Sequence, residues 1–506
     1  EASVALDVKG DLSRVVDMRA DVKAKGVRVR AGKPEGNALG LSLTCRGDLS
    51  LDMSKESLLI KNGAFDLGRG SGTFSGRVEH IRKDPVVNMS AASGNIDPGA
   101  VLGMLGIIRA AEPGRFSMAG PMSIRLDAAG PVGGIRIGAR ADMGSMAVRY
   151  GTFLDKPAGS TCTASLRLAR TPGQIAIESL DVRVASFEAH GSGKVHKVPS
   201  GSRVALDLAT GQVSLQEAQR LVPVMQPFSP SGSVRIRAAL EAGASLPITL
   251  SARAVSDRVA LVLAAPKREA AGKEGVLAEP ARADLKAAEL ALDAVRRDRS
   301  LSMKGKVSSR GGVFMKIPYS TMNATFALRE GRLTVTSFDL DALRGSMKAT
   351  AAYDLKTRAW SARPVFSGIE AGEILDVITP FKGVFTGSLN GDLALGAVTG
   401  APVMNTLSAK GRLSVGKGQW KNFDLAGHVL GKVLGVPGAS MLFGLAPAEI
   451  QRYESTRFDA METEIDLEKR LVTIDTMKML NISSGRDTDA ESYLKGSVSL
   501  DTEALD

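Results

Sequence analysis

Apolar and polar residues alternate with a period of two along most of the chain. Val4, Leu6 and Val8 show this pattern, and so do the segments around Val204 and Val234. Because successive side chains of a strand point to opposite faces, the alternation predicts strands with one apolar and one hydrated face. Gly, Asn, Asp and Pro recur between these segments, which favours antiparallel strands joined by tight turns. We therefore expect a mainly β fold, an elongated, curled antiparallel β-sheet groove with a few short amphipathic helices.

One order of elements recurs three times, which predicts loose internal repeats. Strands lead to a short helix and then to an aromatic residue followed by a glycine, and these glycines, Gly120, Gly232 and Gly387, are 112 (232 minus 120) and 155 (387 minus 232) residues apart. A loop insertion near 265–282 explains the longer interval. The expected segments are a first groove repeat with its closing helix (1–120), a second repeat (121–232), a third repeat with the insertion (233–387) and a C-terminal segment with a helix near 424–445 (388–506).

The short helices carry sequence signals at both ends. Asp97 precedes Pro98 at a first helical position, and Ser214 with Glu217 has the spacing of a capping box. Prolines that follow apolar runs should end each helix and return the chain to strands. These prolines are Pro113, Pro223 and Pro380.

A curled sheet of this kind would turn its apolar face inward. Each methylene group buried there is worth about 0.8 kcal/mol, so an open trough lined by aliphatic side chains suits acyl chains. The residues expected to line this groove are Leu58, Ile60, Ile124, Leu126, Leu166, Leu168, Val204, Leu206, Leu208, Val234, Ile236, Leu333, Val335, Leu393 and Leu395.

The formal net charge of +11 indicates attraction to anionic surfaces. The Lys and Arg residues are scattered singly, with the densest cluster at Arg296, Arg297 and Arg299, and aromatic residues make up only 4% of the chain. Nucleic-acid binding usually needs a basic patch with aromatic stacking platforms, so we expect no nucleic-acid partner. Diffuse attraction to anionic lipid head groups fits the charge at least as well.

Two cysteines are too few and too far apart for a disulfide framework or a metal knuckle. Cys45 and Cys162 each lie in register with apolar neighbours, so we interpret both as buried thiols on the inner face of a strand. A disulfide between them is the alternative.

No constellation of catalytic or metal-binding residues stands out. His190 and His196 could share a strand face, but no Cys or carboxylate cluster accompanies them. The glycine-rich stretch 68–72 precedes a strand pattern rather than a helix, which favours a turn or bulge over a phosphate loop. The acidic pairs at i, i+2 spacing are expected on the hydrated face, and a glycosidase pair would also need an aromatic sugar cleft. These residues are Asp339 and Asp341, and Glu462, Glu464 and Asp466. We therefore expect a protein that is not an enzyme and uses no metal or cofactor.

The C-terminal part of the chain resembles a known family. The stretch 411–427, GRLSVGKGQWKNFDLAG, and the later segments 456–460, 471–474 and 494–500 resemble, in order, the C-terminal segment of the AsmA family. The upstream repeats resemble the β-rich body of that family, which is related to TamB and to bridge-like lipid transporters. The chain starts at Glu1 without the family's N-terminal membrane helix, so we expect it to be part of a longer or processed protein.

The resemblance implies a periplasmic protein that is anchored to the bacterial inner membrane through a segment absent from this chain. It further implies that the protein binds phospholipid or another acyl-chain lipid, transfers it between the inner and outer membranes and so supports outer-membrane biogenesis. An alternative is a non-catalytic assembly factor that assists the insertion or targeting of outer-membrane proteins through exposed sheet edges. A third class, an extracellular β-solenoid adhesin or polysaccharide lyase, predicts more regular rungs than the loose period shows.

Overall fold

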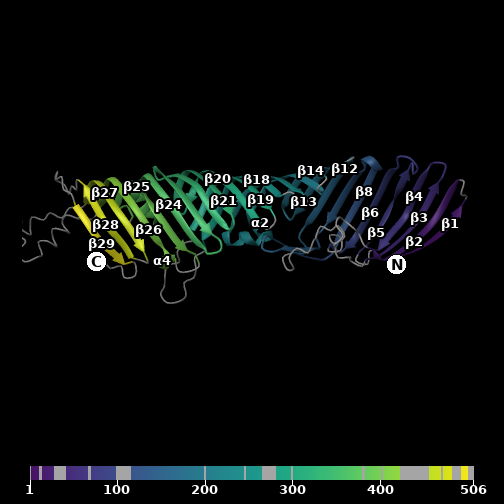
Figure 1. Cartoon of the computed structure of the whole chain (residues 1–506), viewed down its shortest axis with the longest axis horizontal. Coiled ribbons are helices and arrows are strands. Elements are labelled where there is room, and N and C mark those ends of the chain that lie inside the picture. Colours follow the sequence, from purple (N-terminus) through teal and green to yellow (C-terminus); the bar gives the residue numbers. More distant parts are fainter. Residues whose placement is uncertain are drawn as a thin grey trace, which may run out of the picture. The chain divides into compact units, whose positions relative to one another are not determined.

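The chain folds as a mainly β protein, which confirms the fold class predicted from the alternation (Figure 1). The structure is a computed structural model, and every printed strand pairing in it is antiparallel. It describes residues 2–10, 14–27, 41–66, 70–98, 116–171, 173–198, 201–243, 247–264, 281–297, 300–378, 382–399, 403–421, 455–468, 471–480 and 492–499. The expected helix near 424–445 lies outside these residues, as does the expected loop at 265–280, whereas residues 281 and 282 belong to a strand.

Contacts along the chain define two compact units, unit 1 (Glu1–Val255) and unit 2 (Ser256–Asp506). The strands that lie wholly in unit 1 are β1 (Ala2–Gly10), β2 (Val15–Val27), β3 (Leu41–Asp52), β4 (Ser57–Asp66), β5 (Ser71–Glu79), β6 (Val86–Ile96), β7 (Phe116–Ala119), β8 (Met122–Pro131), β9 (Arg136–Asp142), β10 (Ala147–Tyr150), β11 (Leu154–Lys156), β12 (Cys162–Thr171), β13 (Gln174–Val184), β14 (Phe187–Val198), β15 (Gly201–Thr210), β16 (Val213–Ser214) and β17 (Ser231–Gly243). The four-segment division expected from the repeats stays a prediction beside this division into two units.

Unit 2 continues the same strand-turn-strand order. Its strands are β19 (Ala281–Arg297), β20 (Ser300–Phe314), β21 (Ile317–Arg329), β22 (Arg332–Ala342), β23 (Gly345–Asp354), β24 (Ala359–Glu370), β25 (Phe385–Val398), β26 (Ser408–Lys421), β27 (Ser455–Glu468), β28 (Leu471–Leu480) and β29 (Ser492–Ser499), while β18 (Ile248–Ala264) contains the boundary between the units. Within each unit, neighbours in the sheet are mostly neighbours in sequence, so tight turns supply most of the connections.

The described helices are short and stand between strands. They are α2 (Leu215–Leu221), α3 (Ala371–Ile378), α4 (Val403–Thr406) and two 3-10 helices, η1 (Val132–Gly134) and η2 (Pro223–Phe228). The predicted capping box at α2 is confirmed in its first half, since the Glu217 backbone N–H donates to the Ser214 hydroxyl at 3.4 Å, whereas the Glu217 carboxylate accepts a hydrogen bond from the Ser186 hydroxyl. The expectation for Pro223 is wrong in part, because α2 ends before it but the chain enters η2 rather than a strand. The fixed φ of proline suits a first helical position, which explains this start.

The repeated glycines occupy a backbone conformation that few other residues adopt. The φ angles of Gly120, Gly232 and Gly387 are 106°, 102° and 142°, in the region that favours glycine. A Cβ on Gly120 would lie 2.7 Å from the carbonyl oxygen of Ser145. The recurrence of glycine at these positions therefore has a shared steric cause.

Candidate functional site

One face of the main sheet in unit 1 is apolar from strand to strand. The pairing register places residues of this kind directly opposite one another, so they form rows that run across the strands. One such row comprises Leu6, Ala20, Gly47, Gly63, Phe74, Ala91, Leu126, Ala139, Leu166, Leu180, Gly191, Leu208 and Ala238. The adjacent row comprises Val8, Met18, Leu49, Ile60, Gly76, Met89, Ala128, Ile137, Leu168, Ile177, Gly193, Leu206 and Leu240. We call this surface the apolar face of unit 1.

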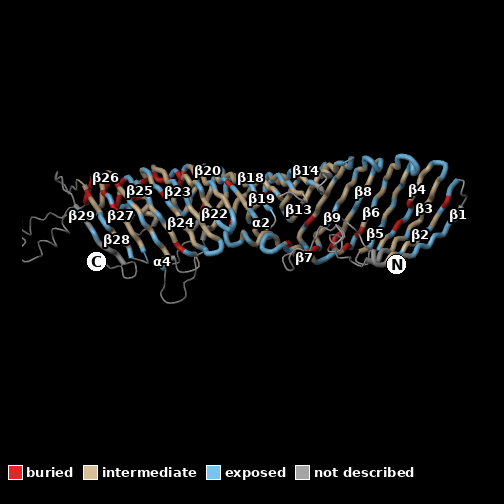
Figure 2. The backbone as a smooth tube through the Cα atoms, in the orientation of Figure 1, coloured by how far each residue is buried: buried red, intermediate tan, exposed pale blue. Residues whose placement is uncertain are grey.

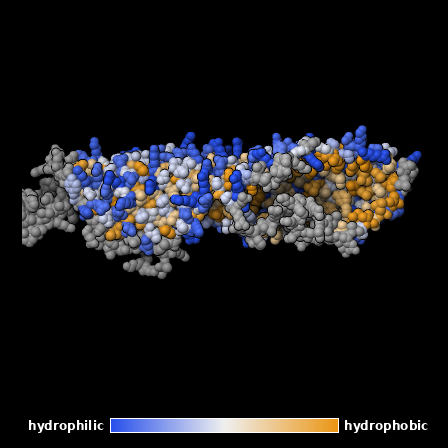
Figure 3. All heavy atoms as spheres, in the orientation of Figure 1, coloured by the Kyte–Doolittle hydropathy of each residue, from blue (hydrophilic) through white to orange (hydrophobic). Residues whose placement is uncertain are grey.

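The apolar face of unit 1 is only partly covered. Leu126 is 44% exposed and Leu6 is 56% exposed, while Leu166 and Leu206 are half-buried. Figure 2 shows half-buried and exposed residues alternating along these strands, and Figure 3 shows hydrophobic side chains gathered on a hollowed surface over the N-terminal strands. Apolar side chains that are contiguous and accessible mark an interaction surface rather than a packed core.

Large side chains on this face lie flat against glycines of the neighbouring strand. A Cβ added to Gly63 would approach the Phe74 ring to 2.6 Å, so the ring occupies the space above the glycine. The same arrangement recurs in unit 2, where the Phe326 ring covers Gly305. An aromatic side chain that covers a cross-strand glycine fills the space that the missing Cβ leaves. These rings therefore lie along the sheet and do not project from its apolar face.

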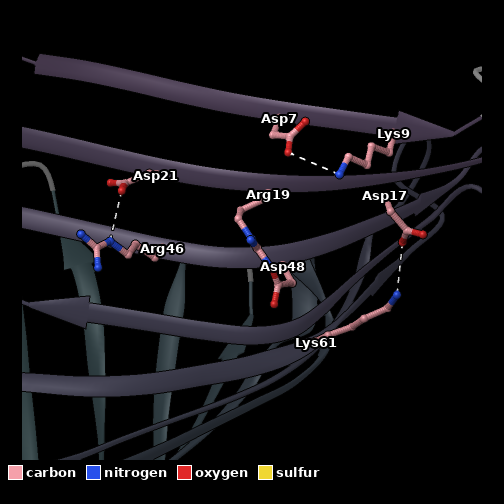
Figure 4. A network of polar contacts seen from close by, with 8 residues as sticks. All are labelled: Asp7, Lys9, Asp17, Arg19, Asp21, Arg46, Asp48 and Lys61. Carbon is pink, nitrogen blue, oxygen red and sulfur yellow. Dashed lines mark hydrogen bonds and ion pairs between the residues drawn. The ribbon is translucent and has the colours of Figure 1, made fainter.

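The opposite face of the same strands is charged and hydrated (Figure 4). Ion pairs cross between neighbouring strands, from Arg46 to Asp21 at 3.1 Å and from Arg19 to Asp48 at 3.0 Å. Lys61 reaches Asp17, two strands away, at 3.1 Å. Because these pairs are solvent-exposed and screened by water and salt, they add little to stability. They do define which face of unit 1 meets water.

Unit 2 has an apolar face built in the same way. One row on it comprises Leu292, Gly305, Phe326, Val335, Ala351, Ala362, Leu395, Ala409 and Leu467. The charged residues again alternate to the other face, where Lys410 pairs with Asp466 at 3.0 Å and Arg412 pairs with Glu464.

The register places all the predicted groove residues on these apolar faces. In unit 1 they are Leu58, Ile60, Ile124, Leu126, Leu166, Leu168, Val204, Leu206, Leu208, Val234 and Ile236. In unit 2 they are Leu333, Val335, Leu393 and Leu395. Their role in holding lipid stays a prediction.

Part of the apolar face of unit 2 is closed by a packed core. The aromatic ring of Phe385 lies 5.7 Å from that of Trp420 and 5.8 Å from that of Phe458, measured between centroids. Ala371 and Leu375 of α3 pack in the same cluster. This core contains Trp420 and gives the tryptophan a structural role.

Both cysteines are free thiols on the strands of unit 1, and the predicted burial is confirmed for Cys162 but only in part for Cys45. Cys162 is 6% exposed, and Cys45 is half-buried opposite Phe65 on the apolar face. Burial disfavours the thiolate and raises the pKa of both thiols above the ordinary value.

We expect alkylation with iodoacetamide to be slower at both cysteines than at free cysteine near neutral pH. A raised pKa leaves less thiolate, the reactive form, and moves the pH at which alkylation accelerates upward. Cys45 should react before Cys162 because it is the more accessible thiol. Mass spectrometry of peptides after timed alkylation gives the order, and faster labelling of Cys162 would contradict the burial of its side chain.

The residues considered for catalysis are separated or engaged elsewhere. His190 and His196 share the polar face of β14, but at six residues apart along a strand they lie roughly 20 Å from each other. Nδ1 of His190 lies 2.7 Å from Oδ1 of Asp181, and this hydrogen bond is the main cause that lowers the pKa of the Asp181 carboxyl.

The acidic residues predicted on a hydrated face lie there, with Asp341 accepting a hydrogen bond from Thr321. Within the described ranges no group of three or more His, Cys, Asp or Glu residues is placed to hold a metal ion.

The glycine-rich stretch 68–72 enters a strand, as predicted. β5 begins at Ser71, whereas a phosphate loop would feed a helix N-terminus.

One buried lysine was not predicted from the sequence. Lys156 is 2% exposed, and its ammonium group donates to the carbonyl oxygens of Gly144 at 3.3 Å, of Pro157 at 3.2 Å and of Met146. Three carbonyl acceptors satisfy the ammonium group's donors, so Lys156 fastens β11 to the turn that precedes β10 rather than presenting a reactive amine. Its neighbours in sequence gave no signal of burial.

Comparisons with known proteins leave the resemblance to the AsmA family as a prediction. Neither a family model, nor a curated protein, nor a solved structure matches the chain. Among the residues that the structure describes, no helix combines the length and hydrophobicity needed to cross a membrane.

Proposed function

We propose that the apolar faces bind the acyl chains of lipids and that the protein transfers phospholipid between the inner and outer membranes of a bacterial cell envelope. The observation that carries this proposal is the set of apolar rows across β1 to β17, which leave accessible side chains such as Leu126 at the centre of the sheet. Water-exposed apolar rows are unfavourable unless something apolar covers them part of the time.

The lining is smooth and weakly selective, which suits an acyl chain. Leu, Val, Ile, Ala and Met dominate the rows, and the large ring of Phe74 lies over a glycine. Aliphatic walls contact an acyl chain by area and shape, with little demand for directional polar contacts. Transfer in the periplasm and support of outer-membrane biogenesis rest on the resemblance of residues 411–500 to the AsmA family.

Lipid that co-purifies with the protein tests the binding step. We expect mass spectrometry of organic extracts to find phospholipid in stoichiometric amounts after expression in a bacterium and purification without detergent. Transfer is then measured with donor vesicles that carry a fluorescent phospholipid and unlabelled acceptor vesicles. A lipid-free protein that also fails to accelerate exchange would overturn the proposal.

The second candidate is a non-catalytic factor that assists outer-membrane protein assembly. Crosslinking separates the two, because photoreactive residues at Leu206 or Ile236 lie on the apolar face of unit 1. They should label lipid under the first proposal and polypeptide under the second. The polar-face neighbour Ala205 is a matched position from which neither label is expected.

A further inference from the structure

One edge of unit 2 concentrates positive charge. The end of β19 and the start of β20 (296–297 and 300), the turn between β21 and β22 (329–332) and the turn between β23 and β24 (354–358) lie at the same edge of the sheet, because these strands form successive antiparallel hairpins. We call these three turns the basic edge. Their described residues include six Lys or Arg and two acidic ones, a net charge of +4 (6 minus 2) out of the formal total of +11.

The turns of the basic edge are neighbours in space although they are far apart in sequence. The Leu355 backbone N–H donates to the carbonyl oxygen of Gly331 at 2.9 Å, which joins the second turn to the third. Each hairpin is two strands wide, so successive turns lie about 10 Å apart. This spacing is comparable with the Debye length of about 8 Å at physiological salt, so the charges reinforce one another.

The cations of the basic edge point outward with apolar side chains between them. The described ones are all exposed, namely Arg296, Arg297, Arg329, Arg332, Lys356 and Arg358. Leu301 beside the first turn is 45% exposed and Leu355 in the third is 53% exposed. Asp354 forms the third turn by accepting hydrogen bonds from the backbone N–H groups of Lys356 at 2.9 Å and Thr357 at 2.8 Å.

Three connections at the opposite edge of unit 2 that the structure describes wholly or in part carry no such excess of charge. The connections 314–317, 342–345 and 370–385 carry Lys316, Arg344 and Lys382 against Glu370, Glu373 and Asp376, so they are neutral in sum. Arg344 and Glu373 also lie within 3.6 Å of each other. Among these six connections the excess positive charge therefore lies at one edge.

We propose that unit 2 docks through its basic edge on the surface of an anionic lipid bilayer. Each Lys or Arg near an anionic leaflet strengthens attraction roughly fivefold, and exposed leucines between cations can enter the head-group region. Nucleic acid fits less well, since the three turns contain no aromatic residue to stack on bases. Docking of this kind does not depend on lipid being held in the apolar faces.

Vesicle co-sedimentation of the full chain tests the proposal. The chain should bind vesicles of phosphatidylcholine mixed with phosphatidylglycerol, and bind less as salt rises, while vesicles of phosphatidylcholine alone should retain little. The quadruple variant Arg297→Gln, Arg329→Gln, Arg332→Gln and Lys356→Gln should lower the partition coefficient at least about tenfold. Leu301→Ser with Leu355→Ser should lower it as well, without changing the net charge.

A second quadruple variant provides the matched control. Lys304→Gln, Lys306→Gln, Lys348→Gln and Arg363→Gln remove the same charge from exposed positions on the polar face of the same strands, and should leave binding within about twofold. Equal losses in the two variants, with unchanged circular dichroism, would overturn the proposal, because attraction would then follow net charge alone. Tighter binding to a double-stranded DNA oligonucleotide, lost in the first variant, would also overturn it.

Discussion

Replacing Leu126 by aspartate is expected to abolish acyl-chain binding and to leave the sheet folded. Leu126 sits on β8 between Ala91 and Ala139, in the centre of an apolar row. A carboxylate placed under an acyl chain loses its hydration without gaining a partner, which costs several kcal/mol. Affinity for a fluorescent fatty acid or phospholipid should fall by at least about two orders of magnitude, measured by titration.

The fold should survive this change because Leu126 is 44% exposed in the absence of ligand. The aspartate can then reach water, and the free energy of unfolding should change by less than about 1 kcal/mol. Arg125→Asp is the matched control, since Arg125 is the adjacent residue on the same strand and faces the polar side. Retained lipid binding in Leu126→Asp, or an equal loss in Arg125→Asp, would contradict binding on the apolar face.

The two faces were predictable from the sequence because alternation maps directly onto strand geometry. The pairing of Leu166 with Ala139 and with Leu180 shows that alternating segments far apart in the chain align in register. A one-residue slip would have moved every predicted residue to the hydrated face. Because the aligned register keeps the apolar side chains together on one face, the pattern itself carries this information.

Irregular positions could not be placed from alternation. Ile60 and Gly63 both belong to the apolar rows although they are three residues apart, because the pairing of β4 shifts between them. The pairing of β22 shifts in the same way between Val335 and Phe338. A bulge inserts an extra residue into one strand, and alternation gives no signal for which residue that is.

The basic edge could not be predicted from the sequence, because its residues are far apart along the chain. Arg297, Arg329 and Lys356 are separated by whole strands, so they look like scattered charges. Only the hairpin pairing brings their turns to one edge. The cluster at Arg296, Arg297 and Arg299 is visible in the sequence, but the residues that lie beside it at the edge of the sheet are not.

Phe385→Ala is expected to produce the largest loss of stability in unit 2. The Phe385 side chain is 8% exposed and contacts the rings of Trp420 and Phe458. Its truncation leaves a cavity and removes an edge-to-face contact with Trp420, whose interplanar angle is 89°. Core Phe to Ala changes cost about 3–5 kcal/mol, and the aromatic contacts place this one toward the upper end.

The chain contains its own reporters for this measurement. The only tryptophans, Trp360 and Trp420, belong to unit 2, and the only cysteines, Cys45 and Cys162, belong to unit 1. In urea, the tryptophan fluorescence transition of Phe385→Ala should move to a lower concentration. Thiol labelling should begin at the same urea concentration as in the unchanged protein, because every residue in the Phe385 cluster lies in unit 2.

Val365→Ala serves as the control for the loss of side-chain volume. Val365 lies on β24 in the same unit but is 46% exposed on the polar face, so its truncation removes little buried area and should shift the fluorescence midpoint only slightly. Equal shifts for Val365→Ala and Phe385→Ala would show that the aromatic cluster does not stabilise unit 2. A parallel shift of thiol labelling in Phe385→Ala would show instead that the two units unfold as one, since the loss of a contact in unit 2 would then expose cysteines in unit 1.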